Sequence, residues 1–199
     1  MSTRTPTAVG EFAEQHFEQL LQLAPEEATM LGRPGVETLY RDYSPAGREA
    51  FAQLKRQALT QLESLQPADA VDEVTVHAMR ERIELDLALH EPGRTELHNI
   101  SSDAHSIRMV LELMPQSTDE DFVHSAGRLQ NLPEALDGDW ASLQQSQAAG
   151  HVAPARQVRA AAEQAASWAE PVGALASLIT AAQAAGVSET VLERLRTGV

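Results

Sequence analysis

The twenty residues from Val71 to His90 constrain the fold of this chain more than any other stretch. Apolar side chains recur there every three or four residues, the period of an α-helix, in one stripe of Val76, Met79, Ile83 and Leu87. A second apolar stripe runs beside the first and contains Ala78, Leu85 and Leu89. A helix with so wide an apolar face needs cover from two sides. We therefore expect it to be the central helix, near residues 72–90, of a helical bundle.

Helical spacing of apolar residues continues through most of the remaining chain, and the alternation that predicts β-strands is absent from the sequence. Start signals occur where Ser44 precedes Pro45 and where Thr118 precedes three acidic residues, with Asp121 at the capping-box position. Stop signals follow at Gly32 and Gly186. The sequence predicts an all-α fold of about eight or nine helices and no sheet.

The composition changes near residue 150. Between Ala148 and Ala185, 16 of 38 residues are alanine, whereas the preceding part is richer in larger apolar residues. We expect residues 1–7 to be a disordered tail, residues 8–150 to form the helical core, and residues 151–199 to be an Ala-rich helical extension packed on the same domain. Pro133 is expected to open a new helix, because proline suits the first turn and disrupts the interior.

The overall charge excludes one class of partner. The chain has 29 acidic and 15 basic residues and a net charge of −14, which argues against binding nucleic acid through its phosphates. It has no cysteine, and therefore neither disulfides nor thiolate chemistry. Its first residues lack the apolar segment of a signal peptide, and no apolar run approaches the length of a membrane span. These features lead us to expect a cytoplasmic protein without a membrane partner.

Known catalytic and metal-binding motifs do not occur in the sequence. His90-Glu91 begins like the zinc motif H-E-x-x-H, but Arg94 replaces the second histidine and Pro92-Gly93 would break the helix. Diiron bundles use Glu-x-x-His pairs, and the chain has only one related tetrapeptide, from Asp121 to His124. Asp86 and His90 share a helix face and could form half a metal site, but no second pair completes it. We predict no catalytic, cofactor-binding or metal-binding residue in this chain.

The densest cluster of polar residues lies between residues 98 and 108. One interpretation places these side chains along a binding cleft, with five candidate cleft-lining residues: His98, Asn99, Asp103, His105 and Arg108. A simpler interpretation has Ser102 or Asp103 cap the following helix and leaves the histidines in solvent. The sequence leaves both interpretations open.

Five phrases, in this order along the chain, resemble one bacterial family, the large helical proteins of domain of unknown function 885. The phrases are Ala24–Gly32, Asp42–Gly47, Ala78–Leu87, Ile107–Pro115 and Arg156–Ala169. The resemblance implies a mostly helical protein similar to zinc metallopeptidases and considerably longer than this chain. Its zinc motif and glutamate base would lie in a C-terminal half that this sequence does not match, so no catalytic residue can be carried over to a position here.

The resemblance implies a non-catalytic role: an N-terminal helical portion that forms one wall of a substrate cleft. Zinc would belong to the missing C-terminal half, and the expected partners are a peptide substrate or that catalytic half. The alternative is a stand-alone helical module that binds a small ligand or a partner protein. A half-protein should expose a large apolar patch and form homo-oligomers, whereas a self-sufficient module should have a closed core. An acidic mimic of nucleic acid is the weakest hypothesis, because the charge is spread along the chain.

Overall fold

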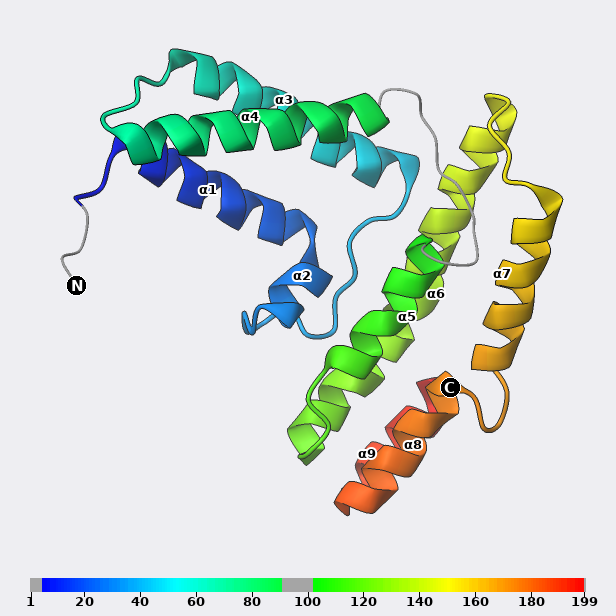
Figure 1. The fold of residues 1–199 in the computed structure, drawn as a ribbon. Helices are drawn as coiled ribbons and strands as arrows, with labels where there is room; N and C mark the ends of the chain where they lie inside the picture. Colours follow the sequence, from blue (N-terminus) through cyan, green and yellow to red (C-terminus); the bar gives the residue numbers. More distant parts are fainter. Residues whose placement is uncertain (1–4, 91–101, 199) are drawn as a thin grey trace. The chain divides into compact units, whose positions relative to one another are not determined.

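The computed structural model describes residues 5–90 and 102–198 of the chain. These ranges contain nine α-helices and no strand, which confirms the all-α prediction (Figure 1). Chain contacts divide the protein into two compact units, one of residues 1–23 and 46–94 and the other of residues 24–45 and 95–199. This division by contacts does not test the expected ranges of residues 1–7, 8–150 and 151–199, which stay a prediction.

The first unit is built from three helices, α1 (Ala8–Leu23), α3 (Pro45–Ser64) and α4 (Ala70–His90) (Figure 1). Its core is made by the buried side chains of Phe12, Ala58, Leu62 and Ile83, which come from all three helices. The start of α1 is tied to α4 by a hydrogen bond that the Thr7 hydroxyl donates to Asp72, at 2.8 Å.

The burial of α4 differs from the sequence expectation in one respect. Its first stripe faces the core, with Ile83 buried and Val76, Met79 and Leu87 packed around it. In the second stripe, Leu85 and Leu89 are 48% and 66% exposed. The expectation that this helix is covered from two sides is therefore wrong. In a unit of three helices, each helix packs against its neighbours along one stripe. The second stripe of α4 is interspersed with charged residues, so it can face solvent.

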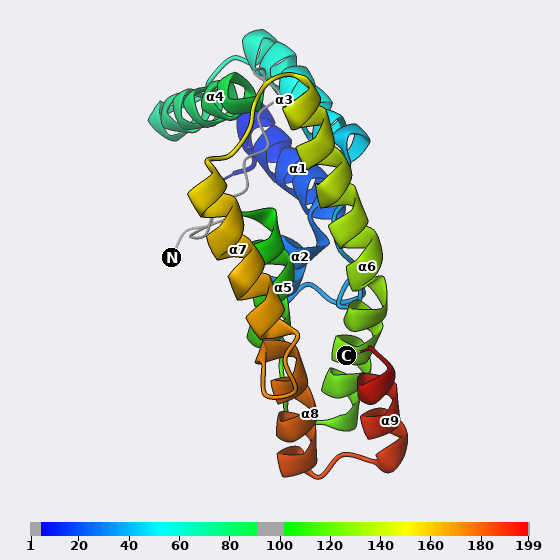
Figure 2. The same ribbon diagram turned by 90° about the vertical axis from the view of Figure 1, so that its right-hand side faces the viewer.

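The second unit contains six helices (Figure 2): α2 (Pro25–Met30), α5 (Asp103–Leu113), α6 (Asp119–Ala148), α7 (Ala155–Trp168), α8 (Ala174–Ala185) and α9 (Glu189–Gly198). The longest, α6, packs against α5 and α9, while α8 lies between α7 and α9. Four of these helices supply the main core, whose buried residues are Leu111, Met114, Phe122, Ala126, Leu129, Leu178, Ala182, Val191, Leu192 and Leu195.

The start of α6 follows the predicted capping box. The Asp121 N–H donates to the Thr118 hydroxyl at 3.2 Å, and the Asp121 carboxylate accepts from the Thr118 N–H at 2.9 Å. Aspartate, one methylene shorter than the usual glutamate, therefore closes the box. Hydrogen bonds from the Ser117 and Thr118 N–H groups lower the pKa of Asp121.

The prediction that Pro133 opens a new helix is wrong, because α6 runs through it as one helix of 30 residues. Proline inside a helix removes one hydrogen bond and crowds the preceding turn, at a cost of about 3 kcal/mol. Contacts on both sides of Pro133 outweigh this cost. Before it, Asn131 donates to the Thr38 carbonyl at 2.9 Å, and after it, Ser142 donates to the Tyr43 carbonyl at 2.7 Å.

These two hydrogen bonds belong to a longer contact between α6 and the connection of residues 36–44, which we call the 36–44 segment. Two glycines in α6 allow the close approach. A Cβ atom at Gly127 would lie 2.6 Å from Thr38 Cγ2, and one at Gly138 would lie 3.0 Å from the Ser44 nitrogen. Glycine weakens a helix interior, so its presence at both positions is explained by the segment that lies against them.

Among the described residues, no helix has both the length and the apolar character needed to cross a bilayer.

Candidate functional site

The first element of the candidate site is the start of α5, where a histidine takes a capping role. The N-cap is Ser102, whose N–H donates to His105 Nδ1 at 3.3 Å and whose hydroxyl oxygen lies 2.8 Å from the same nitrogen. Glutamate or glutamine usually fills this position of a capping box. The imidazole ring is thereby fixed over the first turn, which confirms Ser102 as the cap of this helix.

The other edge of the His105 ring reaches α7. Its Nε2 lies 3.3 Å from Gln164 Oε1, and its ring meets the Trp168 ring edge-on, with 5.1 Å between centroids. An amide oxygen only accepts, so Nε2 carries the hydrogen while Nδ1 accepts from Ser102. Both ring nitrogens are thus used in joining α5 to α7.

Arg108 lies one turn further along α5 and touches the same tryptophan. Its guanidinium carbon is 5.0 Å from the centre of the Trp168 ring, a cation–π contact. One terminal nitrogen, Nη1, donates to the Glu112 carboxylate four residues on. The Nε atom is buried and has no hydrogen-bond partner. Arg108 Nε is therefore a buried donor whose hydrogen bond no described group accepts.

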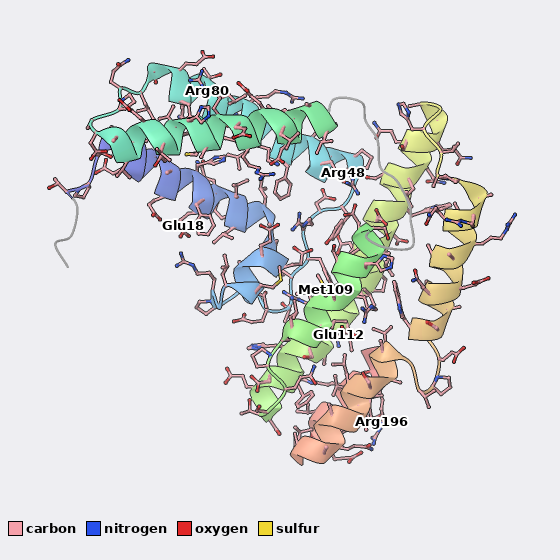
Figure 3. All side chains as sticks on the ribbon, viewed as in Figure 1. Glu18, Arg48, Arg80, Met109, Glu112 and Arg196 are labelled. Carbon is pink, nitrogen blue, oxygen red and sulfur yellow. The ribbon has the colours of Figure 1, made fainter. Side chains whose placement is uncertain are left out.

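A pocket of about 260 Å³ adjoins Arg108 in the second unit. Its lining combines residues of α5, Gln116 in the connection after α5, and residues from the first turns of α8: Arg108, Leu111, Glu112, Gln116, Ala174, Leu175, Ser177 and Leu178. Figure 3 labels Glu112 on α5. Leucine side chains form the apolar part of this lining. On its polar part, the Arg108 guanidinium and the Glu112 carboxylate lie beside each other.

Three of the five predicted cleft-lining residues lie among the described residues, and the structure brings two of them together. His105 and Arg108 meet at Trp168. Asp103 is close enough to Tyr43 for its charge to contribute to the raised pKa of that phenol, after burial and Glu26. His98 and Asn99 lie outside the described residues. Gln164 and Trp168 were missed by sequence reasoning, since the sequence shows Trp168 only as the end of an apolar stripe.

A second polar network lies in the interior of the same unit, around Glu26. This residue is 4% exposed, and its carboxylate accepts from the Tyr43 hydroxyl at 2.7 Å and from the Arg41 N–H at 3.2 Å. Burial alone would lower the pKa of Arg41, but Glu26, Tyr43 and Glu27 together outweigh it and raise that pKa. Burial, followed by Glu26, raises the pKa of Tyr43 and keeps its phenol protonated as a donor.

Arg128 of α6 belongs to this interior and is fully excluded from solvent. Its Nη2 donates to the Thr29 hydroxyl at 2.8 Å and to the Val36 carbonyl at 2.9 Å, and its guanidinium carbon lies 5.5 Å from the Tyr40 ring. Burial lowers the pKa of Arg128. Its Nε and Nη1 atoms have no hydrogen-bond partner. Together these contacts hold α2 and the 36–44 segment against α6.

In the first unit, both members of the candidate half metal site of α4 contact residues of α3. Asp86 lies 2.8 Å from Lys55 Nζ, and His90 Nε2 lies 3.2 Å from the Glu49 carboxylate, so both residues face α3. Across residues 5–90 and 102–198, no three side chains of histidine, aspartate or glutamate are grouped as metal ligands. The donor set of the described residues therefore does not fit a zinc ion.

An apolar groove of about 500 Å³ lies between the end of α6 and the start of α7. Its most prominent member is Trp140, which is 59% exposed, and Val152 and Val158 are also exposed beside it. Exposed apolar side chains that adjoin one another in this way are typical of surfaces that are covered by a partner.

A comparison with protein families matches residues 25–199 to the family described as "Bacterial protein of unknown function (DUF885)". The match spans most of the chain. This protein belongs to the DUF885 family. No curated protein matches the chain.

In this DUF885 protein, three of the phrases that carry the family resemblance meet around Tyr43. The phrase Ala24–Gly32 supplies Glu26, the acceptor of the Tyr43 hydroxyl, and Tyr43 itself belongs to the phrase Asp42–Gly47. The phrase Ile107–Pro115 supplies Ile107, which is buried in a small apolar cluster with Tyr43. Three segments that are separate in the sequence thus form one packed site.

Proposed function

We propose that the chain is a non-catalytic helical portion of a longer protein similar to zinc metallopeptidases, in which it forms one wall of the substrate cleft. The activity class comes from the resemblance, in which zinc and the general base belong to a C-terminal catalytic half. No residue of this chain is assigned a catalytic role. The contribution proposed for it is to hold a peptide.

The contact of Arg108 with Trp168 beside the 260 Å³ pocket carries this proposal. Peptides offer carbonyl and carboxylate oxygens, which an arginine edge can bind, and side chains that pack on aromatic and aliphatic surfaces. Both kinds of group occur here on neighbouring turns of α5 and at the end of α7. This supports a binding surface for a peptide and requires no chemistry from the residues that line it.

The test uses the longer protein from the source cells, first found as a polypeptide substantially larger than the 21.6 kDa of this chain. In that protein, Arg108→Gln should raise KM for peptide hydrolysis about tenfold and leave kcat nearly unchanged, because a cleft wall contributes binding that is the same in the ground and transition states. A fall in kcat with KM unchanged would contradict a pure binding role. An endogenous product of 21.6 kDa would contradict the proposal altogether.

The apolar groove beside Trp140 gives an independent test of whether this chain is one part of a larger assembly. A half-protein should self-associate through such a surface when the other half is absent. We expect analytical ultracentrifugation of this chain to show homo-oligomers, and Trp140→Ser to shift them toward monomer. Val172→Ser is the matched control, because Val172 is 90% exposed and does not line the groove.

A stand-alone helical binding module, for a small ligand or a partner protein, is the second candidate function. The observation that favours it is the pocket at Arg108, which lies wholly within one compact unit. A monomeric chain that binds a small ligand without any further polypeptide would support this candidate over the cleft wall.

A further inference from the structure

The apolar groove beside Trp140 has the composition of a surface that binds another polypeptide. Its apolar lining includes Trp140 of α6, Val152 in the connection before α7, and Val158 of α7, which are 59%, 69% and 40% exposed. Tryptophan and arginine are enriched at the centres of protein interfaces, whereas lysine, glutamate and aspartate are depleted there. The groove follows this rule, because its lining includes Arg159 and none of the three depleted types.

The connection between α6 and α7 is held in place by its own hydrogen bonds. The His151 N–H donates to the Ser146 carbonyl at 2.9 Å, and the Gly150 N–H donates to the Gln147 carbonyl at 2.9 Å. Gly150 has φ of 86°, a conformation that glycine adopts readily. A surface that is preorganised in this way loses little conformational entropy on binding.

The charge of the groove is opposite to that of the chain as a whole. Its lining contains one arginine, one histidine and no carboxylate, in a chain with 29 acidic and 15 basic residues. Arg156 is exposed three positions before Arg159, so two cations are neighbours on α7. Neither arginine forms an ion pair with a carboxylate of the described residues. Carboxylates of a partner would relieve the repulsion between them.

Nearby carboxylates limit where the acidic groups of a partner can lie. Asp137 is exposed three positions before Trp140 on α6, and Glu163 is exposed four positions after Arg159 on α7; neither lines the groove. Acidic groups would therefore be repelled on the α6 side and attracted beside Arg156 and Arg159. The groove thus favours a segment with an apolar face and carboxylates along one flank.

We infer that this groove binds an acidic amphipathic segment of a partner polypeptide. The apolar face of that segment packs on Trp140 and Val158, and its carboxylates lie beside Arg159 and Arg156. The inference rests on the part of the proposed function in which another polypeptide covers this groove, and it adds the chemistry of that polypeptide. The net charge of −14 opposes such a partner only weakly, because the Debye length is about 8 Å at physiological ionic strength and the neighbouring arginines dominate.

The experiment compares the binding of three peptides to the 199-residue chain by titration calorimetry at physiological ionic strength. Each peptide repeats two leucines followed by two glutamates, two glutamines or two lysines, over about 14 residues, which is roughly 20 Å of helix. We expect the glutamate peptide to bind about fivefold more tightly than the lysine peptide, the ratio that two exposed ion pairs of ordinary strength give, with the glutamine peptide between them. The net charge acting alone would produce the opposite order.

Arg159→Glu should abolish or reverse the preference for the glutamate peptide. The variant should fold, because an acidic residue near the N-terminus of α7 complements the helix dipole. Arg194→Glu is the matched control: it makes the same change in net charge at an exposed arginine of α9 outside the groove, and should keep the wild-type order of affinities. Trp140→Ser should weaken the binding of all three peptides.

Analytical ultracentrifugation of the same mixtures tests whether a second copy of this chain occupies the groove instead. The bound glutamate peptide should convert homo-oligomers to monomers. Homo-oligomers without binding of any peptide would assign the groove to a second copy and overturn the inference. A lysine peptide that binds as tightly as the glutamate peptide, or more tightly, would also overturn it. Both outcomes leave the KM test of Arg108→Gln unaffected, so failure of this inference is distinguishable from failure of the proposed cleft wall.

Discussion

Tyr43 donates its hydroxyl hydrogen to the Glu26 carboxylate at 2.7 Å in the interior of the second unit, where each residue is only 4% exposed. A carboxylate removed from water needs several donors to remain charged. Glu26 has the phenol of Tyr43, the N–H of Arg41 and, at 3.4 Å, the Arg41 Nε. Glu26 of α2 and two residues of the connection that follows, Arg41 and Tyr43, thus fix the path of that connection.

Tyr43→Phe should lower the free energy of unfolding of the second unit by about 1.5–3 kcal/mol, the usual range for a hydrogen bond to a charged group. The ring and its packing against Ile107 and Ala135 remain, so the loss reports the hydroxyl alone. Urea unfolding followed by tryptophan fluorescence measures it selectively, because Trp140 and Trp168 both belong to the second unit.

Tyr40→Phe is the matched control for this prediction. The Tyr40 hydroxyl donates at 3.0 Å to the Ile107 carbonyl, a neutral acceptor, and should be worth only about 0.5–1.5 kcal/mol. If the two variants lost equal stability, the charge of Glu26 would contribute nothing to the Tyr43 hydrogen bond.

The sequence predicted the helical fold because apolar spacing and caps are local signals. Thr118 and Asp121 cap α6 as their spacing indicates, and Gly186 ends α8 in the left-handed conformation with φ of 72°. The sequence did not predict the continuity of α6 through Pro133. There the local signal favours a break, and the contacts that override it come from the 36–44 segment, some 90 residues earlier in the chain.

The candidate site was predictable to a smaller extent. Polar density between residues 98 and 108 pointed to His105 and Arg108, but the partners that orient them, Gln164 and Trp168, come from another helix. The sequence shows Glu26 only as an acid in the first turn of α2, and its burial depends on Arg41 and Tyr43. Such pairings are set by tertiary packing, which spacing along one helix does not encode.

Gly138→Ala should destabilise the second unit although alanine favours a helix. The new Cβ atom would lie 3.0 Å from the Ser44 nitrogen and 3.2 Å from the Tyr43 carbonyl carbon, and backbone atoms cannot rotate away. We expect the cost of overpacking, about 1–3 kcal/mol, to exceed the gain of about 0.5–1 kcal/mol in helix propensity. The shift of the urea midpoint by tryptophan fluorescence measures the balance.

Gly127→Ala provides the comparison for Gly138→Ala, because its Cβ atom meets only the side chain of Thr38. The double variant Gly127→Ala, Thr38→Ser removes the methyl group that would clash and should recover most of the stability lost by Gly127→Ala alone. No serine or alanine at residue 38 can relieve Gly138→Ala in this way. A stabilised Gly138→Ala variant would contradict the close contact between α6 and the 36–44 segment.

Pro133→Ala should stabilise the second unit. Pro133 is exposed, so the change removes little packing and restores the N–H that can donate to the Leu129 carbonyl one turn earlier. Replacing an interior proline with alanine stabilises the folded helix by about 3 kcal/mol. Alanine also gives the unfolded chain more conformational freedom, which offsets up to about 1 kcal/mol of that stabilisation. A net gain of about 2 kcal/mol is expected by urea unfolding. Glu134→Ala, at the adjacent exposed position, should change stability by less than about 0.5 kcal/mol.

His16 should make the first unit less stable in mild acid. This histidine of α1 is 5% exposed, its Nδ1 has no hydrogen-bond partner, and it stacks on Phe12. Burial, and then the charge of Lys55, lower its pKa below the ordinary value of 6.5. The unfolded chain therefore binds a proton more readily than the folded one, and the stability that neutral His16 provides is complete above about pH 6.5 and declines as the pH falls below it.

An NMR titration of the histidine ring protons tests the direction of this shift, with His16→Gln used to assign the signal. His16→Gln should also flatten the dependence of first-unit stability on pH between 7.5 and 5, followed by far-UV circular dichroism, because glutamine does not titrate there. His77→Gln, at an exposed position of α4, should leave that dependence as it is in the wild-type chain. If the His16 signal titrated above pH 6.5, the pH dependence of first-unit stability would have the opposite sign. Protonation would then stabilise the first unit, and Nδ1 would need a hydrogen-bond partner.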